Sequence, residues 1–300
     1  MYRSFHQVMS ERFGCKVYKL ALDGGMTCPN RDGTIHERGC IFCSECGSGE
    51  FAEPYCQDIA IQLEQAKLRV NRKNKDGKYI AYFQSFTNTY APVQYLEHLF
   101  KRAIDSPDIV ALSIATRPDC LPTEVIELLG RLHQEKPVWV ELGLQTIHPK
   151  TVSYIRRGYT EECFEDAVTR LKEAGLEIIV HMILGLPGET RDMMVQTAKY
   201  IGQCGADGVK LQLLHVLEGT DLAEEYDRGS FETLSLEEYI QVLEACIRVL
   251  PPDMVIHRLT GDGPKTKLIA PLWSGNKKRV LNEIRVAFQR DKLQQGSLWR

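Results

Sequence analysis

Short segments rich in β-branched and aromatic residues alternate with helical patterns along the first two thirds of the chain. A helix between two consecutive strands requires a crossover connection, which places those strands in parallel. Several of the segments are apolar at both alternating positions, as strands covered on both faces are. The sequence therefore predicts an α/β fold with a parallel sheet or barrel. Six strands are predicted, at residues 16–22, 78–84, 109–115, 138–145, 177–183 and 209–214.

The last third of the chain follows this alternation less strictly. A helical pattern over residues 236–249 ends before a Pro-Pro pair, a strand-like segment covers 254–259, and a further helical pattern covers 276–289. No low-complexity linker separates these segments from the others. We therefore expect a partial barrel over residues 1–220 and a helical elaboration over 221–300 that packs on the same domain.

Composition limits the kinds of function that the chain can have. With 43% hydrophobic and 26% charged residues among 300, it matches an ordinary globular protein. A formal net charge of −3 excludes nucleic-acid binding by bulk positive charge, so such binding needs a local patch. The most apolar stretch, residues 178–187, has about half the length needed to cross a bilayer, and the N-terminus lacks a secretory signal. We expect a cytoplasmic protein without a membrane partner.

Ten cysteines are unevenly distributed, and four of them lie between Cys28 and Cys46. In a reducing compartment such clustering favours a metal centre over disulfide bonds. One alternative is a structural zinc site with four thiolates, and another is a ferredoxin-type run over Cys40, Cys43 and Cys46. The third is a four-iron four-sulfur cluster on Cys28, Cys40 and Cys43 that leaves one iron open. The spacing alone leaves all three open.

Further motifs follow the predicted strands, whose carboxyl ends meet at one edge of a parallel sheet or barrel. In chain order, the motifs are DGGMTCPNRDGTIHERGCIFC from Asp23, YFQSFTNTYAP from Tyr82, SIATRPDCL from Ser113, ELGLQT from Glu141, IRRGYT from Ile155, HMILGLPGET from His181 and RLTGDGPKTKLIAPLWS from Arg258. In this order, over nearly the whole chain, they resemble the radical S-adenosylmethionine (radical SAM) superfamily. Within it they are similar to the branch of the Elongator catalytic subunit and to the YhcC/YtqA-type family.

The resemblance implies an incomplete parallel (β/α)6 barrel with its site at the carboxyl ends of the strands. It also implies a [4Fe–4S] cluster ligated by Cys28, Cys40 and Cys43, with the open iron chelated by the amino and carboxylate groups of S-adenosylmethionine (SAM). Reduction by a one-electron donor such as flavodoxin or ferredoxin would cleave SAM to a 5′-deoxyadenosyl radical. The protein would fix the geometry and exclude water.

The resemblance further implies which side chains contact SAM. By their place in the motifs these are Ser85 and Thr87 at the methionine amino group, Arg157 at its carboxylate, Gln145 and His181 at the ribose, and Ile183 and Leu186 at the adenine. An arginine suits a carboxylate because it donates two parallel charged hydrogen bonds.

Three positions depart from the family pattern. Ser85 and Phe86 stand where the superfamily usually has glycines, and Ala115 stands where related branches have glutamate. Cys46 is additional to the pattern, and as a fourth ligand it would close the cluster to SAM. We therefore expect Cys46 to be a free thiol.

The YhcC/YtqA-type family is linked to modification of the wobble uridine, so the resemblance implies tRNA as the partner. The implied reaction removes the carboxymethyl group from 5-carboxymethylaminomethyl(-2-thio)uridine. A radical SAM enzyme acting on another RNA position or on a small metabolite is one alternative, and a metal-stabilised binding module without catalysis is another. The basic segment from Arg258 to Arg285, with Trp273, is a candidate for RNA contacts. The basic segment Lys67–Lys78 is predicted to be a solvated helix face.

Overall fold

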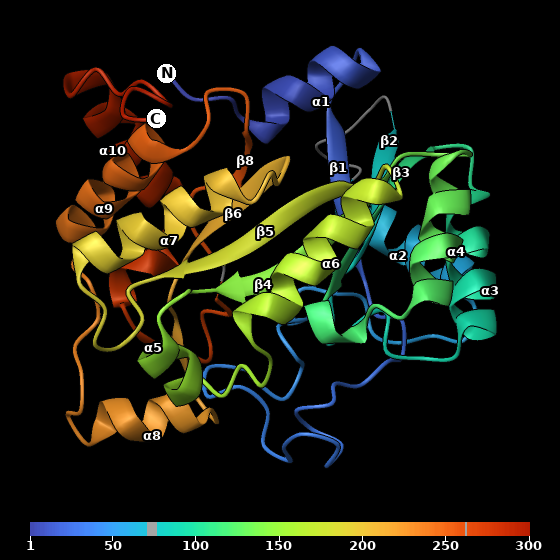
Figure 1. The fold of residues 1–300 in the computed structure, drawn as a ribbon, viewed down its shortest axis with the longest axis horizontal. Coiled ribbons are helices and arrows are strands. Elements are labelled where there is room, and N and C mark those ends of the chain that lie inside the picture. The colour runs from blue at the N-terminus through green and yellow to red at the C-terminus, as the bar shows by residue number, and fades with distance from the viewer. Residues whose placement is uncertain (71–76, 262) are drawn as a thin grey trace.

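A curled parallel sheet is the frame of the molecule (Figure 1). The computed structural model describes residues 1–70, 77–261 and 263–300, and in this part of the chain seven strands pair in parallel. The sheet is an open barrel of α/β type, which agrees with the expected partial barrel. In spatial order, its strands are β1 (Val17–Leu22), β2 (Lys78–Phe83), β3 (Ile109–Thr116), β4 (Val138–Gln145), β5 (Glu177–Leu184), β6 (Gly208–Leu213) and β8 (Val255–Arg258).

The seventh strand comes from the C-terminal part of the chain. β8 pairs with β6 from Gly208↔Val255 to Lys210↔Arg258. The N-terminal segment lies along the other edge of β8, where the amide of Ile256 donates a hydrogen bond to the carbonyl of Arg3 at 2.9 Å. The C-terminal elaboration therefore contributes a strand to the barrel in addition to its helices.

The outer face of the sheet is covered by helices. Outward positions of the strands are large and apolar, and helix α3 presents Leu96, Phe100 and Ala103 to them from one face. Burial of one such Leu or Phe side chain contributes about 1.5–3 kcal/mol to folding. The helices of this layer and of the C-terminal part are α2 (Ile59–Val70), α3 (Val93–Ile104), α4 (Thr123–His133), α6 (Glu161–Glu173), α7 (Arg191–Gln203), α9 (Leu236–Val249) and α10 (Lys277–Arg290).

Side-chain caps fix where several helices begin. Thr160 accepts a hydrogen bond from the amide of Cys163 at the start of α6, and Thr190 caps α7 in the same way. Ser235 and Glu238 form a reciprocal capping box at the start of α9. Each cap satisfies amides that have no partner within the helix and contributes about 1 kcal/mol.

The inner face of the sheet carries an apolar layer at the end where the strands begin. Ile80, Trp139 and Ile179 point into the barrel there and pack against Met9 and Phe5. Those two residues belong to α1 (Phe5–Phe13), which covers this end of the barrel at the top of Figure 1. Helix α1 therefore closes one end of the barrel, and the opposite end carries the cysteine loop.

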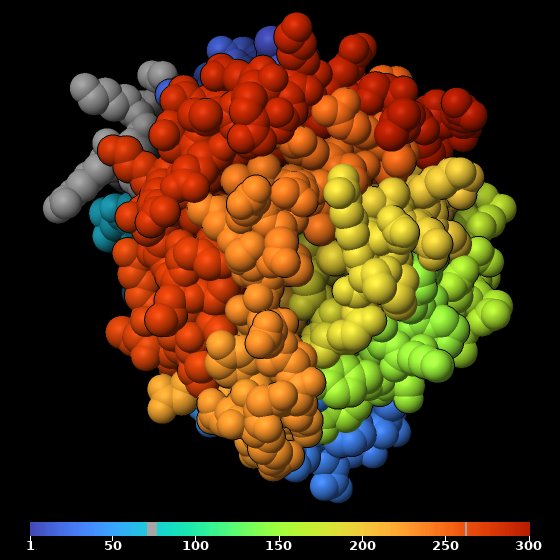
Figure 2. Space-filling view, turned by 90° about the vertical axis from the view of Figure 1, so that its left-hand side faces the viewer, coloured from blue at the N-terminus to red at the C-terminus, as the bar shows by residue number. Residues whose placement is uncertain are grey.

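The C-terminal helices pack on the side of the barrel. Helix α9 lies against α7, and α10 lies against α9. In Figure 2, α7 belongs to the yellow part of the chain, α9 to the orange part and α10 to the red part. Trp273 is partly buried: its Nε1 donates a hydrogen bond to the carbonyl of Leu234 at 3.0 Å, and its ring packs 5.7 Å from that of Tyr239. Its contact with RNA stays a prediction. Shorter elements nearby are α5 (Pro149–Tyr154), α8 (Asp221–Asp227) and the antiparallel pair β7 (Val216–Leu217) and β9 (Leu268–Ala270).

The predicted solvated face over Lys67–Lys78 lies largely outside the described residues, since 71–76 are not among them. Its first residue, Lys67, is buried in α2 and pairs with Asp108 at 2.6 Å and Glu64 at 2.7 Å. Lys67 is therefore a structural ion-pair partner. In the described ranges, no helix has the combined length and apolar character to span a bilayer.

We expect the α1 closure to contribute measurably to stability. Met9→Ala should lower the free energy of unfolding by about 2–5 kcal/mol, because Met9 is only 4% exposed and its removal leaves a cavity. Leu68→Ala is the control: Leu68 is 72% exposed, so its effect should stay within about 0.5 kcal/mol. Urea unfolding followed by circular dichroism measures both. Equal effects would show that α1 does not seal the barrel.

Candidate active site

Between the apolar layer and the cysteine loop, the barrel interior is hollow. The cavity has a volume of about 500 Å³, a size typical of small-molecule sites. Phe5 of α1 lines it at the closed end, and the loop between β1 and α2, residues 23–58, lines it at the open end. The loops after the first four strands all reach this cavity, through Cys43, Thr87, Arg117 and Gln145. The motifs that are scattered along the sequence therefore surround one site.

Three cysteines lie together at the open end. Cys28, Cys40 and Cys43 line the cavity, whereas Cys46 is exposed and is not among the described residues that line it. Burial raises the pKa of Cys40 to about 12, and the neighbouring Cys43 also raises it. The Asn30 side-chain amide donates a hydrogen bond to Cys40 Sγ at 3.4 Å, and this hydrogen bond lowers the pKa of Cys40. The three thiols are thus within electrostatic reach of one another.

The cysteine loop is fixed by hydrogen bonds of the chain itself. The buried Asn30 side chain donates to the carbonyl of Arg156 at 2.7 Å, and the Arg31 guanidinium donates to the carbonyl of Cys43 at 2.9 Å. Gly39 has a φ of +77°, and a Cβ there would lie 2.9 Å from Arg31 Nε. Glycine is therefore required at this turn.

The loop after β2 packs directly on the cysteine loop. The amide of Phe86 donates to the carbonyl of Gly47 at 3.0 Å, and that of Thr87 donates to Thr27 at 3.2 Å. A Cβ at Gly47 would lie only 2.3 Å from the Phe86 ring. Thr87 lines the cavity, whereas Ser85 is 2% exposed and does not appear in the described lining. The contact of this loop with a methionine amino group stays a prediction.

Gln145 and Arg157 form part of the cavity wall. Gln145 ends β4 with a φ of +67°, and its Oε1 is buried without a partner among the described residues. Arg157 is 3% exposed, and its guanidinium donates to the carbonyls of Leu144 at 3.0 Å, Thr146 at 2.8 Å and Tyr159 at 3.1 Å. The unpartnered Oε1 of Gln145 can accept a hydrogen bond from a ligand hydroxyl group. Arg157 is held rigidly, and its pairing with a ligand carboxylate stays a prediction.

The β5 residues are divided between the wall and the packing behind it. His181 and Ile183 line the cavity. Leu186 is buried in an apolar cluster with Ile41 and Ile155, to which Ile183 also belongs, and it is absent from the described lining. Leu186 therefore supports the wall from behind, and a direct contact with adenine is not apparent for it.

Apart from His181, which is a predicted ribose contact, the sequence did not reveal a set of polar side chains inside the barrel. Each is the inward-facing polar residue of a largely apolar strand, which is the signal that could have revealed it. We call this set the polar layer, and it consists of Lys19, Tyr82, Ser113, Glu141, His181 and Lys210.

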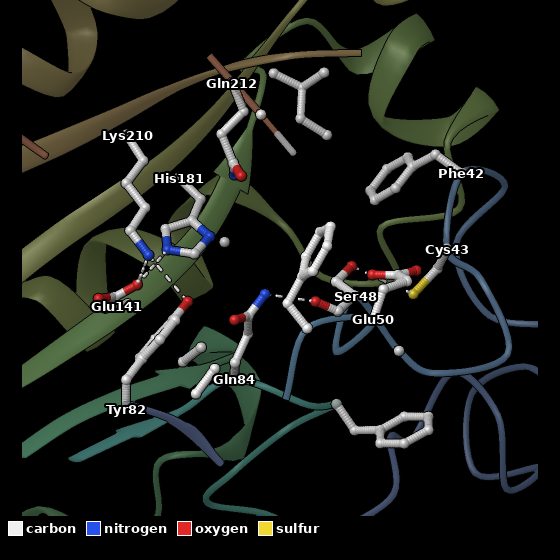
Figure 3. A pocket seen from close by; sticks show the side chains of 18 of the residues that line it. Phe42, Cys43, Ser48, Glu50, Tyr82, Gln84, Glu141, His181, Lys210 and Gln212 are labelled. Carbon is white, nitrogen blue, oxygen red and sulfur yellow. Dashed lines mark hydrogen bonds and ion pairs between the residues drawn. The ribbon is translucent and has the colours of Figure 1, made fainter. Parts of the chain in front are cut away.

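Glu141 is the centre of the polar layer (Figure 3). Its Oε1 accepts from Lys19 Nζ at 2.5 Å and from Ser113 Oγ at 2.6 Å. Its Oε2 accepts from His181 Nε2 at 2.7 Å and from Lys210 Nζ. Burial raises the pKa of Glu141, but the two ammonium groups more than offset this and hold it well below its usual range. Glu141 is therefore a carboxylate.

His181 is neutral in this setting. Burial and the nearby Lys210 ammonium lower its pKa to about 4, although Glu141 acts in the opposite direction. Because the Glu141 carboxylate only accepts hydrogen bonds, the Nε2 of neutral His181 must carry the proton. Its Nδ1 is then an acceptor on the cavity wall, where it can receive a ligand hydroxyl group.

The donor set fits an iron–sulfur cluster with an organic cofactor beside it. Among the described residues, no three His, Cys, Asp or Glu side chains converge on a point as a single metal ion requires. A four-iron cluster binds each thiolate through a different iron, so its ligands need not converge. The three thiols at one end of the cavity therefore suit such a cluster. The hydrogen-bond acceptors of Gln145 and His181 on the cavity wall suit an organic cofactor beside it.

Comparison with known proteins agrees with this site. The Radical SAM superfamily matches residues 35–201, and the Radical_SAM C-terminal domain matches residues 206–290. The protein YtqA of Bacillus subtilis (strain 168) is 44% identical over 299 residues, which cover 100% of this chain and 93% of YtqA.

Two further similarities are more distant. A tRNA uridine(34) acetyltransferase of Methanocaldococcus jannaschii is 32% identical over 178 residues, which cover 58% of this chain and 32% of that protein. The structure of an archaeal Elp3 from Methanocaldococcus infernus shares the fold, with a TM-score of 0.70 at 22% identity over 93% of this chain and 64% of that one. The chain belongs to the radical SAM superfamily, within the YhcC/YtqA family, and is a radical SAM enzyme whose cofactors are a [4Fe–4S] cluster and SAM.

Proposed function

We propose that this enzyme modifies the wobble uridine of tRNA. The reaction would remove the carboxymethyl group from 5-carboxymethylaminomethyl(-2-thio)uridine by a two-electron oxidation of its N–CH2 unit to an imine, with SAM as the oxidant. Water would then release the two carbons as glyoxylate and leave the 5-aminomethyl base. The similarity to a tRNA uridine(34) acetyltransferase carries the proposal, because it relates this chain to a protein that acts on uridine 34. The cavity inside the barrel supports it, since a base extruded from the anticodon loop needs an enclosed site.

Cys28, Cys40 and Cys43 would hold the cluster, and the acceptors on Gln145 and His181 would orient the nucleoside part of SAM. When bound, these cofactors would supply the radical chemistry needed to take a hydrogen atom from the modified side chain. The apolar floor beneath the polar layer excludes water from the closed end, which protects a reactive intermediate from side reactions.

The rim of the cavity offers groups suited to a nucleotide. Phe42 and Phe86 line it, and aromatic rings of this kind stack on extruded bases. Arg31 and Arg69 line it as well, and guanidinium groups there can approach phosphates next to the extruded base. Of the basic segment from Arg258 to Arg285, Arg258 also belongs to the lining.

The cluster ligands are tested by two cysteine variants. Cys43→Ala should lose bound iron and SAM cleavage to 5′-deoxyadenosine, because Cys43 lines the cavity. Cys46→Ala is the matched control and should retain both, because Cys46 is exposed outside it. Anaerobic reconstitution, iron analysis and chromatography of the products measure these outcomes. The reverse pattern would show that Cys46 ligates the cluster in place of Cys43.

The substrate is tested in cells. A deletion strain should accumulate 5-carboxymethylaminomethyl(-2-thio)uridine and lack the 5-aminomethyl nucleoside, as measured by mass spectrometry of digested tRNA. The wild-type gene and the Cys46→Ala variant should restore the product, and Cys43→Ala should not. Unchanged wobble uridines in the deletion strain would refute the tRNA proposal while leaving the radical SAM assignment intact.

A further inference from the structure

The polar layer carries more positive than negative charge. Lys19 and Lys210 share the single carboxylate of Glu141, and Arg258 acts electrostatically on both lysines. His181 adds no negative charge, since it is neutral. Two ammonium groups therefore share one carboxylate in a site with little water, where an incompletely compensated charge is costly.

The excess extends to the described wall of the whole cavity. Seven cationic side chains stand there against three carboxylates, although the chain as a whole has a net charge of −3. The cations are Lys19, Arg31, Arg69, Arg117, Arg157, Lys210 and Arg258, and the carboxylates are Glu50, Glu53 and Glu141. This distribution favours an anionic ligand.

Glu141 has no capacity left to neutralise the lysines further. Each of its oxygens already accepts two hydrogen bonds. Two hydrogen bonds are described for each ammonium: besides Glu141, Lys19 reaches Ser113 Oγ at 3.4 Å and Lys210 reaches Tyr82 OH at 2.9 Å. Both ammonium groups also lie over the Tyr82 ring, 4.7 and 4.3 Å from its centroid. Burial lowers the pKa of both lysines, that of Lys210 well below its ordinary value, and Arg258 acts on both in the same direction, whereas Glu141 raises the pKa of both.

The space next to the lysines is open to a ligand. The inward residues two positions further along the strands include Ala21 and Ala115, whose small side chains leave room in the cavity. Figure 3 shows the polar layer on one side of the cavity and Cys43 on the other. A ligand between them would place one end on the lysines and the rest towards the cofactors.

From this geometry we infer that Lys19 and Lys210 form a subsite for a carboxylate of the substrate. The inference rests on the proposed function for the identity of the substrate, whose carboxymethylamino group ends in a carboxylate. Ion pairs with the lysines hold that end, and the carbon next to it then lies towards the cofactor side of the cavity. The carboxylate of SAM is not the occupant, because in this superfamily it chelates the open iron at the cysteine end.

The subsite is tested first with acetate, independently of tRNA. The holoenzyme with SAM and without reductant is titrated with acetate in a calorimeter, and acetamide serves as the uncharged analogue. Lys210→Met and, separately, Lys19→Met should weaken acetate binding roughly tenfold or more, because each removes a charged hydrogen bond. Lys172→Met is the control and should bind acetate as the wild type does, since Lys172 lies on α6 and pairs with Asp207 at the surface.

The same proteins are then tested with two tRNAs that carry either the 5-carboxymethylaminomethyl or the 5-aminomethyl group. The wild type should prefer the first tRNA, and the lysine variants should lose that preference. Equal binding of acetate and acetamide, or undiminished acetate binding by both folded lysine variants, would overturn the subsite. Loss of acetate binding in those variants combined with no binding of either tRNA would sustain the subsite and refute the proposed function.

Discussion

The buried carboxylate of Glu141 is the interaction on which the interior of this barrel depends. It connects β4 to β1 through Lys19, to β3 through Ser113, and to β5 and β6 through His181 and Lys210. Two of these strands, β1 and β6, are not adjacent to β4 in the sheet, so the contacts of Lys19 and Lys210 cross the hollow of the barrel. Apolar side chains of similar volume would make a more stable interior than buried ions, which cost several kcal/mol each to desolvate. The polar layer therefore has a purpose beyond stability.

The two faces of the sheet carry different tasks. The outer face packs against a layer of helices and supplies most of the apolar burial, with side chains such as Phe83 and Phe100 in edge contact. The inner face begins with a sealed apolar layer and continues with charged and hydrogen-bonding groups around a cavity. Because successive residues of a strand alternate between the faces, one strand serves both tasks.

The sequence predicted the parts of this arrangement that follow from periodicity or from motifs. The six strands, the helix over 236–249 and the meeting of Cys28, Cys40 and Cys43 at one cavity all agree with the structure. Side-chain partners could not be predicted, because Lys19 and Glu141 lie 122 residues apart and only the barrel closure brings them together. The surroundings of Trp273 could not be predicted for a related reason, since only the packing of the C-terminal part shows that its ring is partly buried.

The seal formed by α1 also has a kinetic consequence. On the proposed function, SAM and the modified nucleotide would occupy the same cavity, which α1 closes at the Phe5 end. A docked tRNA would cover the opening at the cysteine loop. SAM would then have to bind before the tRNA docks and the cleaved nucleoside would leave after the tRNA departs, so the proposed function predicts a compulsory-order catalytic cycle.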